Sequence, residues 1–274
     1  MVTTPIQLIS TDFDGTMVSE SEAPSVAPRL QDLLRELQAN GAHWVINTGR
    51  DLVSLNVALR QAQMTVAPDF LVLVEREIFV RKDGGFVGLE EWNQRCTADH
   101  NCLFADVRRD VPRLTAWVRA RFDARVYEDP WSPFCLAARC NEDADTILAY
   151  LEDYCREVPQ LTVVRNDVYA RFSHAGYSKG SALAEIARRL GVSAARIFAA
   201  GDHLNDLSML TRQRAAWLVA PANAVPAVKA AVLEQGGYIS GRPHGHGVSD
   251  GLLRALVLAG GKGNSPRVAC GLAG

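Results

Sequence analysis

No apolar run in this sequence of 274 residues approaches the ~18 residues that a membrane-spanning helix needs. The opening residues, MVTTPIQLIS, also lack the basic start and the long apolar stretch of a secretory signal peptide. An excess of positive charge is missing too, since 29 Lys and Arg stand against 31 Asp and Glu, a net charge of -2. These absences predict a cytoplasmic protein that binds neither membranes nor nucleic acids.

Cysteine pairs at metal-binding or redox spacing are absent as well. The six cysteines form no CxxC sequence and no Cys and His pattern typical of a zinc site. A chain of this length buries a sufficient core without disulfides, so we interpret the cysteines as reduced thiols. His244 and His246 stand two residues apart in RPHGHG without a third ligand nearby, and we expect a mobile polar loop there.

The first third of the sequence alternates predicted strands and helices. Short apolar runs predict buried strands at residues 6–10, 43–47 and 70–74. Apolar residues at helical spacing predict helices around residues 30–37 and over 51–61. Strands that alternate with helices in this way predict a parallel sheet covered on both faces.

The pattern changes near residue 83, where paired strands between helices predict a small, partly antiparallel sheet. After residue 175 the first pattern returns. The predicted fold class is therefore α/β, with a Rossmann-like parallel-sheet core at residues 1–82 and 175–262. An inserted α+β cap occupies residues 83–174, and residues 263–274 are expected to form a flexible tail.

Polar residues gather where predicted core strands end. They are Asp12 and Asp14 in TDFDGT, Thr48, Gly49 and Arg50 in NTGR, and Asp202, Asn205 and Asp206 in GDHLND. The stretch SKGSALAEI sets Lys179 in the first turn of a helix, where the helix dipole favours an anion. Ligands of open parallel sheets bind outside the carboxyl ends of the strands, so we expect these residues to share one crevice.

The four aspartates, Asp12, Asp14, Asp202 and Asp206, would repel one another in such a crevice unless a cation lay among them. A cluster of oxygen ligands without His or Cys suits Mg²⁺, which can also bridge to a substrate phosphate. The Thr48 hydroxyl, the amides of its glycine turn and the Lys179 ammonium would then hold phosphate oxygens. The sequence predicts a site for a phosphoryl group.

The stretches DFDGT, NTGR, SKGSAL and GDHLND, in this order, resemble the four motifs of the haloacid dehalogenase superfamily of phosphotransferases. The insertion between the second and third motifs resembles the larger, C2B-type cap of the Cof-type subgroup, which includes sucrose-phosphate phosphatases and mannosylphosphoglycerate phosphatases. The resemblance extends from about Ile6 to Leu258. It covers nearly the whole chain.

The resemblance implies a role for each motif residue. Asp12 would be the nucleophile that forms an aspartyl-phosphate, and it would also bind Mg²⁺. Asp14 would act as general acid and then as general base, while its backbone carbonyl ligates the metal. Gly15 would permit the tight turn, and Thr16 would orient Asp14.

The remaining motifs would bind phosphate and metal. Thr48, Gly49 and Lys179 would hold the phosphoryl oxygens, and Asn205 would donate to them. Asp202 would be a direct metal ligand, whereas Asp206 would lie behind the metal or hold a metal-bound water. Independently of the resemblance, Asp202 could also be the N-cap of a helix over Leu204 to Leu210. Two further side chains are assigned less specifically: Arg50 is either a substrate contact or a surface residue, and Asn223 is a neighbour of the site.

The chain departs from the family pattern at Glu75-Arg76-Glu77, where related enzymes have a small residue or Asn-Gly. Leaving-group contacts therefore cannot be transferred to this rim. Four aromatic residues of the insertion could pack between cap and core or stack on a sugar ring: Trp92, Tyr127, Trp131 and Phe134.

Together these observations predict a Mg²⁺-dependent phosphatase, a monomer or homodimer, that hydrolyses a small phosphorylated metabolite and favours a sugar phosphate. The cap would open on hinges at residues 82–85 and 173–177. Two alternatives stay open. One is a phosphosugar mutase that uses the same aspartyl-phosphate, and the other is a non-catalytic metabolite-binding protein of the same fold.

Overall fold

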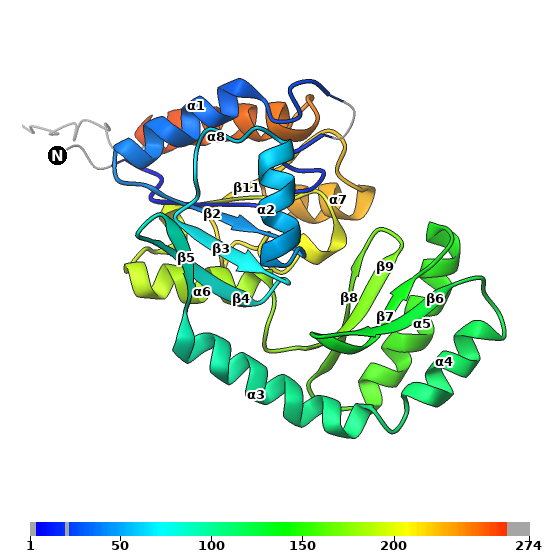
Figure 1. The fold of residues 1–274 in the computed structure, drawn as a ribbon. Coiled ribbons are helices and arrows are strands. Elements are labelled where there is room, and N and C mark those ends of the chain that lie inside the picture. Colours follow the sequence, from blue (N-terminus) through cyan, green and yellow to red (C-terminus); the bar gives the residue numbers. More distant parts are fainter. Residues whose placement is uncertain (1–3, 20–21, 262–274) are drawn as a thin grey trace, which may run out of the picture.

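The computed structural model describes residues 4–19 and 22–261. These residues form an eight-stranded sheet and a four-stranded sheet, each covered by helices (Figure 1). We call the part built on the larger sheet the core and the part built on the smaller sheet the cap. The predicted tail at residues 263–274 lies outside the described residues.

The larger sheet has the strand order β12-β11-β10-β1-β2-β3-β4-β5. Its strands are β1 (Leu8–Thr11), β2 (His43–Asn47), β3 (Phe70–Leu73), β4 (Glu77–Lys82), β5 (Gly85–Gly88), β10 (Ile197–Ala200), β11 (Trp217–Ala220) and β12 (Tyr238–Ile239). Neighbouring strands from β12 to β3 pair in parallel, whereas β4 pairs antiparallel with both β3 and β5. The predicted α/β class with a parallel core sheet is confirmed.

Helices cover both faces of the core sheet. One face carries α1 (Pro28–Ala39), α2 (Leu52–Gln61) and α8 (His244–Gly261), and the other carries α6 (Lys179–Leu190) and α7 (Pro226–Glu234). Alternate residues of each strand reach opposite faces, so Ile9 packs with the first group and Leu8 with the second. Trp44, which is fully buried, satisfies its indole by donating to Thr11 Oγ1 at 3.0 Å.

The cap sheet is antiparallel, in the order β6-β7-β9-β8. Its strands are β6 (Arg125–Asp129), β7 (Ser132–Ala137), β8 (Leu161–Asn166) and β9 (Tyr169–His174). Helices α4 (Val111–Arg119) and α5 (Asn141–Glu157) cover one face, where Phe134, Leu136 and Phe172 are buried. The other face is turned toward the core (Figure 1).

The chain passes from the core into the cap through one helix, α3 (Glu90–Val107). Trp92 and Cys96 near its start pack in the apolar cluster of the core, whereas Phe104 and Val107 near its end pack in that of the cap. The same continuous helix therefore belongs to both hydrophobic clusters.

The predicted start of the cap at residue 83 is wrong in one respect. Asp83 and Gly84 have φ angles of 50° and 82° and form the turn of a hairpin, so β5 pairs with β4 within the core sheet. The chain leaves the core sheet only after residue 88, and residues 82–85 are a hairpin turn rather than a hinge. The division into two units and the second hinge, at residues 173–177, stay predictions.

Two local expectations also need correction. The stretch with His244 and His246 was expected to be a mobile loop, but α8 begins at His244. The segment after Asp202 was expected to be helical from Leu204 to Leu210, and the structure has only a short 3₁₀ turn there, Leu204–Asp206. Among the described residues, no helix is long and apolar enough to span a membrane.

Candidate active site

Three loops meet at the carboxyl edge of the core sheet, because β10, β1 and β2 are adjacent and parallel. They carry Asp12 and Asp14 after β1, Thr48 after β2, and Asp202 after β10. The first loop needs Gly15 for two reasons: its φ angle is 75°, and a Cβ there would lie 2.4 Å from Asp202 Oδ2.

Lys179 is the cation at the centre of the acidic cluster. It is the first residue of α6, which Ser178 caps by accepting a hydrogen bond from Ser181 N at 3.2 Å. Its Nζ lies 2.6 Å from Asp12 Oδ1 and 2.7 Å from Asp206 Oδ1, and its side chain is fully buried. Burial favours the neutral amine, but Asp12 and Asp206 outweigh it and raise the pKa of Lys179 above its ordinary value.

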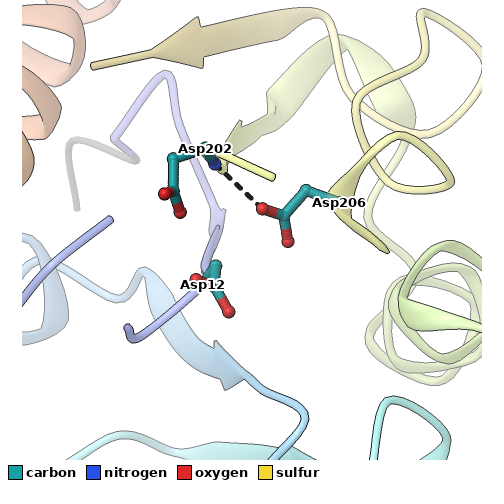
Figure 2. A group of neighbouring side chains, drawn as sticks. All are labelled: Asp12, Asp202 and Asp206. Carbon is teal, nitrogen blue, oxygen red and sulfur yellow. Dashed lines mark hydrogen bonds between the residues drawn. The ribbon is translucent and has the colours of Figure 1, made fainter. Parts of the chain in front are cut away.

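Both carboxylate oxygens of Asp206 accept hydrogen bonds from groups of the protein. Its Oδ2 accepts from the backbone amide of Asp202 at 2.9 Å, the bond drawn in Figure 2. The same oxygen accepts from the amide of His203 at 3.0 Å, and Oδ1 accepts from Lys179. This carboxylate holds the loop after β10 against the lysine. That geometry fits the predicted place of Asp206 behind a metal better than a place as its direct ligand.

One carboxylate oxygen from each of Asp12, Asp202 and Asp206 lies within 4.8 Å of the other two, and Figure 2 shows the three side chains together. Burial, with help from neighbouring carboxylates, raises the pKa of Asp12 well above its ordinary value and that of Asp202 to about 6. A bound cation would offset that repulsion, and the carboxylates of Asp12 and Asp202, with Asp206 behind them, suit Mg²⁺. The residues present therefore fit this metal.

Asp14 stands apart from this group. Its carboxylate is paired side by side with Arg50, with Nε 2.7 Å from Oδ2 and Nη2 2.7 Å from Oδ1. Its predicted part in metal binding rests on its backbone carbonyl and stays a prediction. Thr16, expected to orient Asp14, instead donates to Asp202 Oδ1 at 2.7 Å.

A cavity of about 330 Å³ lies between this edge of the core and the open face of the cap. Its core lining is Asp12, Asp14, Thr48, Gly49, Arg50 and Glu75, and its cap lining is Tyr127, Asp129, Cys135, Val164, Asn166, Tyr169, Ala170 and Arg171. Arg50, which the sequence left undecided between two roles, therefore faces the cavity. Of the four aromatic residues considered, Tyr127 lines it, whereas Trp92 and Phe134 are buried in packing.

A larger cavity, about 570 Å³, opens at the opposite edge of the core sheet beside Trp217 and Arg254. Its lining contains no carboxylate, cysteine or histidine. Volume alone does not identify a reaction centre, and the smaller cavity holds the groups that can do chemistry.

Glu75 and Arg76, whose role the sequence left open, join the core to the cap. Glu75 has a φ angle of 67°, in the tight turn between β3 and β4, and its Oε1 accepts from Asn205 Nδ2 at 2.8 Å. Its Oε2 lies 3.5 Å from Arg171 Nη2 on the cap. Asn205, expected to donate to phosphate, therefore donates to Glu75 in this structure.

Arg76 points away from the cavity and into the cap. Its Nη2 donates to the carbonyl of Trp131 at 2.8 Å, and its Nη1 lies 3.4 Å from Ser173 Oγ. Burial lowers the pKa of this guanidinium, and its exposed fraction is only 4 %. The side chain fastens the cap to the turn that carries Glu75.

Asn223 and His244 hold the Gly15 turn from behind. Asn223 Nδ2 donates to the carbonyl of Gly15 at 2.8 Å, and Asn223 Oδ1 accepts from the amide of His244 at 2.8 Å. His244 Nδ1 lies 2.8 Å from the same Gly15 carbonyl. The predicted neighbour Asn223 thus supports the loop of Asp14, and His244 is a second support that the sequence did not reveal.

The sequence profile of haloacid dehalogenase-like hydrolases matches residues 9–75 and 123–252. The chain belongs to this family. The matched residues include Asp12, Asp14, Lys179 and Asp202, and the expected family and enzyme class, a haloacid dehalogenase-type phosphatase, are confirmed.

Among curated relatives of this haloacid dehalogenase-like hydrolase is the 5-amino-6-(5-phospho-D-ribitylamino)uracil phosphatase YcsE of Bacillus subtilis, 25% identical over 92% of this chain and 94% of the relative. A phosphoglycolate phosphatase of Methanothrix thermoacetophila is 23% identical over 89% and 95%. The sucrose-phosphatase of Synechocystis sp. PCC6803, solved with sucrose and phosphate, superposes with a TM-score of 0.68 at 19% identity, covering 91% of this chain and 97% of that one. These similarities extend over core and cap together.

Proposed function

We propose that this haloacid dehalogenase-like hydrolase is a Mg²⁺-dependent phosphatase of a sugar phosphate or a related hydroxylated metabolite. The observation that carries the proposal is the cluster of Asp12, Asp202 and Asp206 at the edge of the cavity, with the buried Lys179 bound to Asp12 and Asp206. We also propose that the enzyme is cytoplasmic and that it is a monomer or a homodimer. Light scattering on the purified protein would test the oligomeric state.

Asp12 is the proposed nucleophile. One of its oxygens forms a bond to phosphorus as the ester P–O bond breaks, giving an aspartyl-phosphate and the free alcohol. Lys179 opposes the rise in the pKa of Asp12 that burial causes, and it offsets charge on the transferring group. Thr48 and the amide of Gly49 lie in the cavity lining, where they can hold phosphoryl oxygens. Mg²⁺, held by Asp12 and Asp202, would supply further positive charge at the same oxygens.

Asp14 is the proposed proton carrier. It gives a proton to the departing oxygen and then takes one from the water that attacks the phosphorus of the aspartyl-phosphate. That second step releases inorganic phosphate and restores the Asp12 carboxylate. Arg50 orients Asp14 at the mouth of the cavity through two hydrogen bonds of 2.7 Å.

Two relatives support the substrate class. The name of the Bacillus subtilis phosphatase specifies a phosphorylated ribityl chain, and the Synechocystis structure was solved in complex with sucrose and phosphate. Both leaving groups are rich in hydroxyls. We propose a hydroxylated leaving group for this chain on the same grounds, under a cap that selects it.

The deciding experiment measures release of inorganic phosphate from sugar phosphates, polyol phosphates and nucleotides, with and without Mg²⁺. Release that needs both Mg²⁺ and Asp12, with Asp12→Asn as the inactive variant, would support the proposal. Asp32→Asn on the exposed side of α1 is the matched control. No release from folded protein that binds Mg²⁺ would contradict it. ¹⁸O from labelled water in the phosphate would separate hydrolysis from a mutase.

A further inference from the structure

One row of side chains crosses the open face of the cap sheet. Tyr127 lies opposite Cys135, Cys135 opposite Arg171, and Arg171 opposite Val164. Residues opposite one another in a sheet share a face, and all four line the cavity. Arg171 is the only one of the four that carries a charge at neutral pH, so it sets the charge of this row.

Arg171 of the cap meets Glu75 of the core in the wall of the cavity, with Nη2 3.5 Å from Oε2. The side chains are largely enclosed, with exposed fractions of 16% for Arg171 and 9% for Glu75. Glu75 also lies close to the phosphate end of the cavity, because a Cβ on Gly49 would be 3.4 Å from Glu75 Oε1. The pair therefore flanks the space that a leaving group occupies next to a phosphoryl group at Asp12 and Gly49.

The charges along the cavity lining are already paired. Arg50 is bound to Asp14, and Arg171 faces Glu75. The cap contributes one carboxylate to the lining, Asp129, whose Oδ1 accepts from two backbone amides at 2.7 and 2.8 Å. Apart from the groups proposed to hold phosphate, the leaving-group end therefore has more carboxylates than cations, which disfavours a second anion there.

We propose that Glu75 determines specificity: with Arg171 it selects a neutral, hydroxyl-bearing leaving group and rejects one that carries a second acid group. This inference rests on the proposed phosphatase function. A hydroxyl can donate to the carboxylate of Glu75 and accept from the guanidinium of Arg171. A carboxylate of the substrate has no proton to donate, and Glu75 repels it.

The test compares D-glucitol 6-phosphate with 6-phospho-D-gluconate, which differ only by a terminal alcohol or a carboxylate. The measured quantity is the ratio of their kcat/KM values, alcohol over acid. We expect the native enzyme to favour the alcohol at least tenfold, and Glu75→Gln to lower the ratio by about tenfold, chiefly by raising kcat/KM for the acid. Glu77→Gln, the same change two residues along and outside this cavity, leaves the ratio unchanged.

Arg171→Gln is the second variant, and it moves the ratio in the opposite direction. Without the cation, the charge of Glu75 is less compensated, so the preference for the alcohol rises by a few fold. Circular dichroism establishes that each variant is folded. If Glu75→Gln does not fold, the change in the ratio of kcat/KM values in Arg171→Gln tests the proposal by itself.

The inference is overturned if the native enzyme favours the acid, if neither change at the pair shifts the ratio, or if both sugar-chain substrates are inert while 4-nitrophenyl phosphate is hydrolysed. Absence of hydrolysis of all three by folded enzyme with Mg²⁺ would count against the proposed function itself. The nitrophenyl ester therefore separates the two failures.

Discussion

The core edge and the cap face enclose the same cavity but position their side chains differently. At the core edge, Asp12 follows a strand directly and Lys179 opens a helix, so a few neighbouring residues set each position. On the cap face, Tyr127 and Arg171 come from β6 and β9 and share one row only through the register of both strands with Cys135 of β7. The difference separates reaction from selection: changes at Asp12 and Lys179 should slow the reaction of every substrate, whereas changes on the cap face, or at Glu75 opposite it, should alter the choice among substrates.

Among changes at the core edge, we expect Lys179→Met to have the largest effect on activity and stability. The substitution leaves Asp12 and Asp206 buried without the cation that lies within 2.7 Å of both. We expect phosphate release to fall by about 10³-fold or more and the free energy of unfolding to fall by about 3 kcal/mol. A phosphate assay and urea unfolding measure the two effects. Lys82→Met, at an exposed position, should change neither, and native-like rates in Lys179→Met would refute the central role of this lysine.

Asp14→Asn should lower kcat/KM by an amount that depends on the leaving group but not on the cap. An alkyl leaving group needs the proton of Asp14, whereas nitrophenolate departs without one. We expect kcat/KM to fall about 10²-fold for an alkyl phosphate and less than tenfold for 4-nitrophenyl phosphate. Steady-state kinetics on both esters would show it, and equal losses would argue against Asp14 as the acid.

Arg76→Gln tests the attachment of the cap. The guanidinium donates to the carbonyl of Trp131 and reaches Ser173, so its loss loosens the cap without touching the core edge. We expect KM to rise about fivefold with kcat within about twofold, and the free energy of unfolding to fall by about 2 kcal/mol. Arg81→Gln, on the exposed end of β4, is the matched control. A large fall in kcat with unchanged KM would contradict this assignment.

The smallest effect concerns His100 on α3, between cap and core. Its Nε2 lies 3.1 Å from the amide nitrogen of His174, and burial lowers the pKa of His100 to about 3. Because the unfolded chain takes up this proton first, near its ordinary value of 6.5, stability is complete above that pH and is lost as the pH falls toward 3. We expect a loss of about 1 to 2 kcal/mol at pH 5.

Urea unfolding at pH 7.5 and pH 5 measures this loss. His100→Asn should flatten the pH dependence, whereas His43→Asn, away from this contact, should keep it. Parallel pH profiles for the native protein and His100→Asn would show that His100 does not carry the effect.

Much of the core could be predicted from the sequence because its parallel strands are buried on both faces. Continuous apolar runs placed β1, β2 and β3 to within two residues. The hairpin of β4 and β5 was missed since it lies at the sheet edge and carries the exposed residues Arg81 and Lys82. Helix α3 was missed because its buried stripe includes Cys96 and His100 in place of aliphatic residues.

The acidic cluster and Lys179 could be anticipated, since parallel strands bring their carboxyl ends to one edge. The role of Glu75 could not. Its unusual place after β3 was visible, but its partners Arg171 and Asn205 are 96 and 130 residues further along the chain. Only the register of the cap sheet and the close approach of cap to core reveal what its carboxylate faces.

The register of β1 has a consequence for how the polypeptide is made. Leu8 lies opposite Ile197, so the pairing of β1 with β10 joins two segments of the chain that have the entire cap between them. A ribosome must therefore synthesise about 190 residues after β1 before its open edge can be covered by β10, and during that time the edge is exposed to other nascent chains. The cap has all its strands by residue 174 and can fold in the interval. Asp12 is synthesised 167 residues before Lys179, so the two can meet only after the whole cap has been made.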